Sequence, residues 1–269
     1  MSYPHTRLFI AGTWQDAADG KTIAVHNPAT GKEIGRVAHA SKADLDRALE
    51  AAQKGFEAWR DIPAVDRAKT MRRAAALIRE RAESIAAIMV QEQGKPLAEA
   101  KVETMSAAEI IEWFADESQR VYGRIVPSRN LKAQQMVLKD PVGPVAAFTP
   151  WNFPIAIPAW KAAPALAFGN TVVMKPAGLT PATASALADI LVEAGVPKGV
   201  FNLVIGRGGV GQSIVDHPEV DAISFTGSQG VGAGVALGAI KRQARVQLEM
   251  GGKNPLIVME DADLDLAVD

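Results

Sequence analysis

The stretch "TVVMKPAGLTPATASALADILVEAGVPKGVFNLVI", residues 171–205, decides the fold class. Its two ends, 171–175 and 201–205, are short apolar runs with the β-branched residues that are typical of buried strands. The residues between them carry the signals of a helix, with Thr180 as the N-cap and Gly195 as the terminating glycine. Two strands joined through a helix indicate parallel pairing, because parallel strands need a long crossover connection.

Three further apolar runs extend this pattern, at residues 144–149, 222–226 and 245–249. Helical stretches separate them. Apolar strands with helical crossovers predict a Rossmann-like parallel α/β sheet with flanking helices on both faces. We therefore expect the strands of this sheet to be buried.

The segments before and after this predicted sheet have other sequence patterns. Alternating strand patterns and then helical spacing predict an N-terminal strand pair with helices, and a β-rich stretch around a polar turn predicts a protruding arm. After the sheet, a last strand and helix begin a second, incomplete domain. In order, the four segments are residues 1–122, 123–142, 143–250 and 251–269.

The composition excludes several classes of function. The chain has 269 residues, of which 48% are hydrophobic and 22% charged, and a formal net charge of -1. Mixed charges without a single-sign patch argue against nucleic-acid and membrane-surface roles. There is no cysteine and the four histidines are scattered, so we expect no disulfide and no metal site. The N-terminus has no apolar secretion signal, so the expected location is cytoplasmic.

Unusual residues follow each predicted strand of the sheet. Ligands of open parallel sheets bind at the carboxyl ends of the strands, so these residues are the candidates for a site. In chain order they are Trp151 and Asn152, Lys175, Gly206 and Gly211, Gly227 and Ser228, and Glu249.

The glycines among these candidates suit a dinucleotide. Glycines directly before a helix leave backbone N–H groups free for a phosphate, and the Ser228 hydroxyl adds another donor. Lys175 offers an ammonium group for ribose hydroxyls or a 2′-phosphate. However, "GRGGVG" is not the usual dinucleotide fingerprint, and no acidic residue closes the second strand. Tight turns and a solvated lysine are the alternative explanation of the same residues.

Glu249 and Asn152 are candidates for chemistry. A carboxylate at the mouth of an apolar sheet is partly desolvated, which favours a general base. Alternatively, Glu249 is solvated or paired with Lys253. The Asn152 amide can donate to a developing oxyanion without carrying a charge, or it is only a turn former.

Several motifs together resemble the aldehyde dehydrogenase superfamily, which uses NAD or NADP. The resemblance covers the entire chain and is closest to semialdehyde dehydrogenases of the succinate-semialdehyde or 2-oxoglutarate-semialdehyde type. The motifs that carry it are "NPATGKEIGRV", "EQGKP", "PWNFP", "PALAFGNTVVMKP", "AGVPKGVFNLV", "ISFTGS" and "LEMGGKNPLIVMEDADLD".

The resemblance implies roles for individual residues. Asn152 would hold the oxyanion of a thiohemiacetal, Glu249 would activate the water that hydrolyses a thioester, and Lys161 would assist a proton relay. Cofactor contacts would come from Lys175 at the adenosine ribose, from Gly227 and Ser228 at the pyrophosphate, and from Trp151 beside the cofactor. Residues 123–142 would be an oligomerisation arm of a homo-oligomer, and residues 251–269 would begin the catalytic domain.

The sequence departs from the family pattern in its nucleophile. Relatives carry a nucleophilic cysteine after the glutamate, and this chain has no cysteine. The sequence also stops within a helical pattern, so we expect the cofactor-binding half of the enzyme, unable to oxidise an aldehyde through an acyl-enzyme. The alternative is a non-catalytic nucleotide-binding or interaction module. A short-chain or zinc alcohol dehydrogenase is disfavoured, because there is no Tyr-x-x-x-Lys pair and no set of zinc ligands.

Two further departures concern specificity. Gly178 stands where many NAD-preferring relatives have a glutamate, so no carboxylate at this position repels a 2′-phosphate and NADP should be tolerated. Trp160 stands where succinate-semialdehyde enzymes commonly have an arginine. An indole suits an apolar tunnel, which leaves the choice of aldehyde open.

Overall fold

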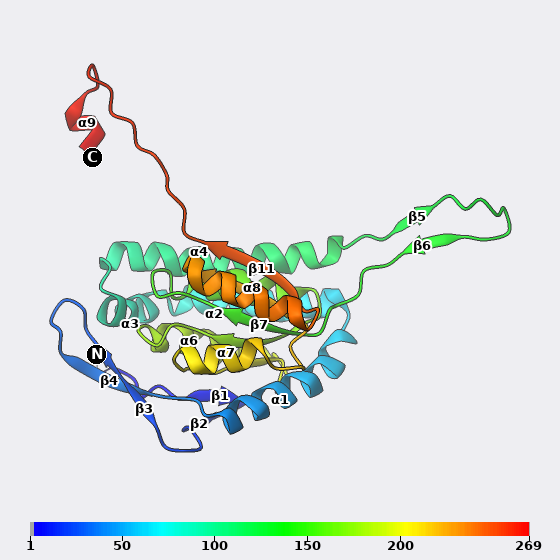
Figure 1. Ribbon diagram of the computed structural model, residues 1–269, viewed down its shortest axis with the longest axis horizontal. Coiled ribbons are helices and arrows are strands. Elements are labelled where there is room, and N and C mark those ends of the chain that lie inside the picture. Colours follow the sequence, from blue (N-terminus) through cyan, green and yellow to red (C-terminus); the bar gives the residue numbers. More distant parts are fainter. Residues whose placement is uncertain (1–2, 269) are drawn as a thin grey trace.

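Five parallel strands form the centre of the computed structural model, which describes residues 3–268, and they occupy the segments that the apolar runs predict. The sheet has seven strands in the order β11-β10-β7-β8-β9-β1-β2 (Figure 1). The parallel strands are β7 (Pro144–Phe148), β8 (Thr171–Lys175), β9 (Phe201–Leu203), β10 (Ala222–Gly227) and β11 (Arg245–Met250). The order reverses at β7, because the chain proceeds outward through β8 and β9 and then returns to β10 on the other side. Such a switch point is where ligands of doubly wound sheets bind.

The N-terminal strands complete this same sheet. β1 (Leu8–Ile10) pairs antiparallel with β9 and with β2 (Thr13–Gln15), so the sheet is mixed rather than purely parallel. The fully buried side chain of Asn202 joins the two parts, because its oxygen accepts from the Ala11 amide at 3.0 Å and its nitrogen donates to a carbonyl of the neighbouring turn at 2.7 Å. A second hairpin, β3 (Thr22–His26) with β4 (Glu33–Ala38), lies outside this sheet.

Helices cover both faces of the sheet. On one face, α1 packs against β7, β8 and β9, and α8 packs against β10 and β11, with α7 between them. On the other face, α5 and α6 lie on the strands and carry an outer layer of α2, α3 and α4. The bounds are α1 Lys42–Arg60, α2 Ala64–Glu80, α3 Ala82–Gln93, α4 Leu97–Glu117, α5 Ala156–Ala167, α6 Pro181–Ala194, α7 Gly208–Val215, α8 Gln229–Lys241 and α9 Leu264–Val268, with a 3-10 turn at Ser118–Arg120.

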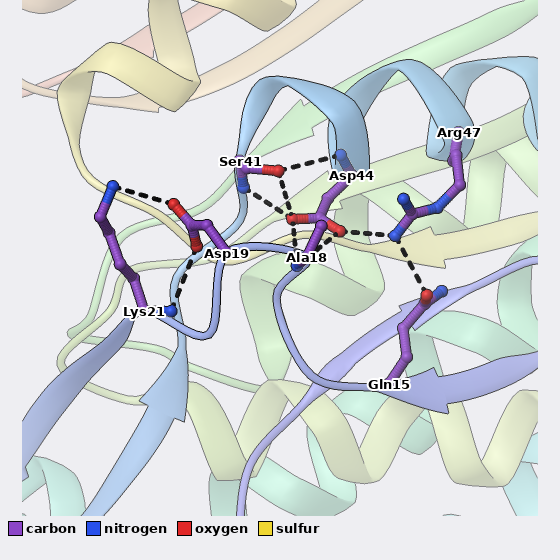
Figure 2. A network of polar contacts seen from close by, with 7 residues as sticks. All are labelled: Gln15, Ala18, Asp19, Lys21, Ser41, Asp44 and Arg47. Carbon is purple, nitrogen blue, oxygen red and sulfur yellow. Dashed lines mark hydrogen bonds and ion pairs between the residues drawn. The ribbon is translucent and has the colours of Figure 1, made fainter.

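Helix α1 begins at the residue that the sequence indicates. Ser41 is its N-cap, and Ser41 and Asp44 form a reciprocal capping box (Figure 2). Asp44 also accepts from the Ala18 amide and pairs with Arg47 at 2.6 Å. Burial opposes ionisation of Asp44, but the hydrogen bonds from Ser41 and Ala18 outweigh it and lower its pKa. The charged form therefore stabilises this end of the helix.

Helix α6 also starts where expected but is capped differently. Thr180 occupies the N-cap position, yet its hydroxyl makes no capping hydrogen bond. Glu92, from the end of α3, accepts instead from the amides of Ala182 at 3.0 Å and Thr183 at 2.8 Å. The cap therefore comes from a residue about 90 positions away in sequence. The helix ends at Gly195 in the left-handed region, at φ 104°, as predicted.

The sheet edge at β11 differs from the expectation. Five of the six residues of β11 are exposed, because the strand lies at the edge of the sheet and pairs only with β10 among the described residues. The expected strand after Gly252 is absent: residues 251–258 have no assigned secondary structure and are exposed, and they lead away from the body to α9 (Figure 1). Among the described residues no strand pairs with them, and the Gln229 side chain donates to the Gly251 carbonyl at 3.0 Å.

The arm leaves the opposite side of the body. It is an antiparallel hairpin of β5 (Arg124–Val126) and β6 (Gln135–Val137), and every residue of both strands is exposed (Figure 1).

Candidate functional site

Lys175 lies in a cavity of about 450 Å³ between α7 and α8, at the carboxyl ends of β7, β8 and β10. Gly211 lines the same cavity, together with Gly230 and Gly234 of α8. Burial lowers the pKa of the Lys175 ammonium group. Within residues 3–268 no carboxylate forms an ion pair with Lys175. Its ammonium group, a charged hydrogen-bond donor, therefore faces the cavity without a partner from the described residues.

The predicted glycines fall into two groups. Gly211 leaves room for a ligand, since a Cβ added there would lie 3.6 Å from the Lys175 Cε atom, an ordinary contact. Gly206 and Gly227 are outside the cavity lining. A Cβ at Gly206 would collide with the Val210 side chain, and one at Gly227 would lie 2.6 Å from the Phe225 ring. These two glycines are therefore required by the packing of the turns.

The start of α8 is open to an anion. Ser228 is the N-cap, but its hydroxyl makes no capping hydrogen bond, so the first N–H groups of α8 have no side-chain acceptor from their own helix. Such groups and the positive helix end favour a phosphate. A buried ammonium, a glycine-lined hollow and this helix end together fit the adenosine and pyrophosphate parts of a dinucleotide.

A second cavity, of about 640 Å³, lies beside α5, β10 and β11. Lys161 and Glu249, two of the residues singled out from the sequence, both line it. Hydrogen bonds connect them in one direction: the Lys161 Nζ donates to the Ser224 Oγ at 2.9 Å, the hydroxyl donates to the Gln247 Oε1 at 2.7 Å, and the Gln247 Nε2 donates to the Glu249 Oε1 at 3.1 Å. The ammonium and the carboxylate are thus joined through two neutral groups.

Lys161 has the properties of a proton-transfer group. Its side chain is 6% exposed, and desolvation lowers its pKa to about 8, while the negative charge of Glu249 acts in the opposite direction. A lysine with this pKa is partly neutral near physiological pH. Lys161 can therefore both donate and accept a proton, unlike an exposed lysine.

Glu249 does not lie at the end of a buried strand, contrary to the expectation. It is exposed on the edge strand β11, where it accepts its hydrogen bond from Gln247. From this edge strand Glu249 reaches the cavity that Lys161 also lines. The described residues include no ion pair between Glu249 and Lys253.

Asn152 lies on the turn between β7 and α5. It is exposed, as are its neighbours Trp151 and Phe153. The Lys95 Nζ donates to the backbone carbonyl of Asn152 at 2.9 Å. A third cavity, of about 540 Å³, adjoins this turn and contains Phe153 and Trp160 in its lining. Trp160 also lines the Lys161 cavity, so the two hollows are neighbours on α5.

Ser224 and Gln247 were missed by the sequence reasoning. A usable signal existed, because residues two apart in a strand share a face, which places Gln247 beside Glu249. The parallel register then sets Ser224 opposite Gln247. The sequence does not reveal which strands are neighbours, so this pairing needs the structure.

The structure offers neither a metal site nor a membrane-spanning helix in the part of the chain that it describes. Residues 3–268 contain no group of three His, Asp or Glu side chains arranged to hold a metal ion. None of the helices in that range is both long and apolar enough to cross a bilayer.

Comparison with known proteins identifies the family. The model of the aldehyde dehydrogenase family matches residues 14–269. The chain belongs to the aldehyde dehydrogenase family. It is 46% identical over 264 residues to a glutarate-semialdehyde dehydrogenase from Pseudomonas aeruginosa and, equally, to a succinate-semialdehyde dehydrogenase [NADP(+)] from Escherichia coli (strain K12). Each match covers 98% of this chain and 55% of the relative, so the chain spans about half the length of these aldehyde dehydrogenases.

Solved structures show the same fold. A crystal structure described as an E. coli NADP dependent enzyme superimposes with a TM-score of 0.94 at 45% identity, covering 98% of this chain and 55% of that one. A 3,6-anhydro-L-galactose dehydrogenase in complex with NAP gives 0.94 at 38% identity, covering 98% and 56%. The resemblance noted from the sequence motifs is therefore confirmed, and so is the Rossmann-like α/β fold.

Proposed function

We propose that this chain is the cofactor-binding part of an aldehyde dehydrogenase that oxidises a semialdehyde with NAD or NADP. The observation that carries the proposal is Lys175, an ammonium group without an ion-pair partner in a glycine-lined hollow at the switch point of the sheet. An adenosine ribose, with or without a 2′-phosphate, supplies the acceptors that this group lacks. The open N-terminus of α8 suits the pyrophosphate.

The residues at the turn and the edge strand have complementary roles. The bound nicotinamide supplies the hydride acceptor. Asn152 donates a hydrogen bond from its side-chain amide to the aldehyde oxygen as that oxygen becomes an oxyanion. Glu249 takes a proton from the water that attacks the acyl group, and Lys161, which lines the same cavity, exchanges protons with water in that cavity.

The nucleophilic step has no candidate in this sequence. Covalent acyl transfer in this family needs a thiol, and the 269 residues contain no cysteine. We therefore propose that the isolated chain binds the cofactor but forms no acyl-enzyme. The same absence favours the alternative, a non-catalytic nucleotide-binding or interaction module. Incubation with an aldehyde and NADP, followed by intact mass and NADPH absorbance, tests this proposal, and an acyl adduct or turnover would contradict it.

A semialdehyde is favoured as the substrate class of the whole enzyme by the relatives, which are named for glutarate and succinate semialdehydes. The cavity beside Asn152 is lined by Phe153, Ile157 and Trp160 and has an apolar character. This lining suits the methylene chain of such a substrate.

Cofactor binding is tested by titrating the purified chain with NADP and NAD and following tryptophan fluorescence. We expect a dissociation constant below about 1 mM, within the range of enzyme substrates. Lys175→Met should weaken binding strongly, because it keeps the stem but removes the ammonium. Lys198→Met, at an exposed lysine far from the α7–α8 cavity, is the matched control. If neither nucleotide binds, or if both variants behave alike, the proposal is wrong.

We also propose that the arm pairs with a second copy of the chain. Its exposed apolar side chains, among them Ile125 at 81% and Leu131 at 101% exposure, are candidates for burial in such a contact. Analytical ultracentrifugation of the chain with and without residues 124–137 tests this, and an unchanged mass would refute it.

A further inference from the structure

The motif "EQGKP", residues 92–96, connects α3 to α4 and places Lys95 against the turn after β7. The Lys95 ammonium donates to the Glu103 carboxylate at 2.5 Å and to the Asn152 backbone carbonyl at 2.9 Å. It also lies 4.4 Å from the centre of the Phe153 ring. The side chains of Lys95 and Glu103 are only 9% and 2% exposed. Lys95 therefore touches two consecutive residues of the turn from a nearly dry position.

Glu103 of α4 holds the other end of the same turn. Its second oxygen accepts from the Ile155 amide at 3.0 Å and the Ala156 amide at 3.2 Å. These amides belong to the first turn of α5, whose N-cap residue, Ile155, supplies no side-chain acceptor. A carboxylate in this position satisfies free N–H groups and complements the helix dipole. One ion pair thus fixes the turn at Asn152 and again at Ile155.

The side chain of Asn152 has no anchor of its own. In the range 3–268 no hydrogen bond reaches its amide group, and the residue is exposed. The position from which the amide projects is therefore set by the backbone at residue 152. That backbone is held through its carbonyl by Lys95, with a longer contact of 3.5 Å from the Gln93 side chain.

We propose that Lys95 and Glu103 are positioning residues that fix the backbone of the turn that carries the Asn152 amide. The proposal rests on the proposed function, in which Asn152 donates to an oxyanion. Such a donor is effective only when it is preorganised, and a displacement of about 1 Å can reduce a rate by about two orders of magnitude. The buried ion pair provides that rigidity from outside the turn, and the exposed side chains of Trp151 and Phe153 could not.

The test measures the turn directly by NMR in the intact chain. The 13C resonance of the Asn152 carbonyl, read through the Phe153 amide, reports the hydrogen bond from Lys95. Lys95→Met should shift this resonance upfield and lower the order parameters of residues 151–153 from about 0.85 to below about 0.6. Glu103→Gln should accelerate hydrogen exchange at Ile155 and Ala156.

Two further variants separate positioning from general damage. Lys95→Arg keeps a charged donor and should restore the order parameters at least in part. Lys101→Met removes a half-exposed lysine of α4, the helix that carries Glu103, and should change none of these signals, because Lys101 pairs only with Glu83. Resonances of β8 and β9 must stay in place in every variant that is compared. If Lys95→Met leaves the turn as rigid as before while the sheet is intact, the proposal is wrong.

The outcome is independent of cofactor binding. If the chain binds NADP but Lys95→Met leaves the order parameters of residues 151–153 unchanged, only the positioning role is refuted. A chain whose turn depends on Lys95 but which binds no nucleotide would instead refute the proposed function.

Discussion

Replacing Lys161 by methionine should stabilise the protein near neutral pH and lose this advantage at high pH. The ammonium group is buried beside α5, and desolvation lowers its pKa from 10.5 to about 8. In the unfolded chain the group regains its ordinary pKa. Between these values the unfolded state holds a proton that the folded state has released, so stability rises with pH across this window.

The magnitude follows from the two pKa values. The interval from 10.5 to about 8 covers about 2.5 pH units, and each unit corresponds to about 1.36 kcal/mol. The charged lysine therefore costs the folded state up to about 3 kcal/mol below pH 8, and nothing above pH 10.5. Methionine removes this cost but also removes the hydrogen bond to Ser224, worth about 1 kcal/mol at any pH.

Urea unfolding at pH 7 and pH 10 measures the difference. The change in the free energy of unfolding caused by Lys161→Met should be more favourable at pH 7 than at pH 10 by roughly 2 to 3 kcal/mol. Because the lost hydrogen bond contributes to the free energy of unfolding at both pH values, its contribution cancels when the two changes are subtracted. The control is Lys69→Met, because Lys69 is exposed and paired only with Asp66 on the surface. That variant should differ between the two pH values by less than about 0.5 kcal/mol.

An effect of equal size at both pH values would refute the reasoning. It would mean that Lys161 keeps its proton in the folded state, and Lys161 could then not act as a proton acceptor near neutrality. Direct titration of 15N-labelled Lys161 gives an independent value. Glu249→Gln should lower the pKa of Lys161 further, since the carboxylate favours the charged lysine.

Two more predictions follow from the helix caps and the cofactor cavity. Ser41→Ala should lower the free energy of unfolding by about 1 kcal/mol, because it removes the N-cap of α1. Thr180→Val should leave the free energy of unfolding unchanged or raise it, because the buried Thr180 hydroxyl has no hydrogen-bond partner among the described residues. Urea unfolding of both variants checks the contrast, and equal losses would contradict it. Gly178→Glu should reduce NADP affinity relative to NAD by at least about tenfold through charge repulsion, since an added Cβ meets only Ile23, at 3.8 Å. Gly178→Gln is the uncharged control in the same titrations, and an unchanged ratio would count against this cause.

The local patterns of the sequence predicted the strands, the crossover helices and several residues of the site. Apolar runs located the five parallel strands, and the strand-end rule singled out Lys175 and Gly211, which line one cavity. These features depend on a few neighbouring residues and on the general geometry of parallel sheets. That is why composition and spacing were enough.

Contacts between distant segments could not be predicted in this way. Glu92 caps α6 and Glu103 caps α5, at sequence separations of 90 and 52 residues. Each appears in the sequence as one more glutamate on a helix. Only tertiary packing brings it to a helix end that lacks a cap.

The prediction that β11 is buried was wrong, although the sequence pattern of this strand indicates its exposure. Residues 245–250 alternate polar and apolar side chains, which is typical of a strand covered on one side only. Their apolar fraction suggested a strand covered on both faces. The alternation was the better guide, because Leu248 is half-buried and Glu249 faces outward.

The open edge of the sheet makes the surroundings of Glu249 depend on protein concentration, because β11, the strand that carries Glu249, can pair with a strand of another copy. β11 is hydrogen-bonded to β10 alone, so alternate N–H and C=O groups along it point away from the sheet. In dilute solution these backbone groups form hydrogen bonds with water. As the protein concentration rises, a strand of another copy competes with water for the same hydrogen bonds. Since Glu249 belongs to this strand, self-association through the edge would change the surroundings of the proposed base.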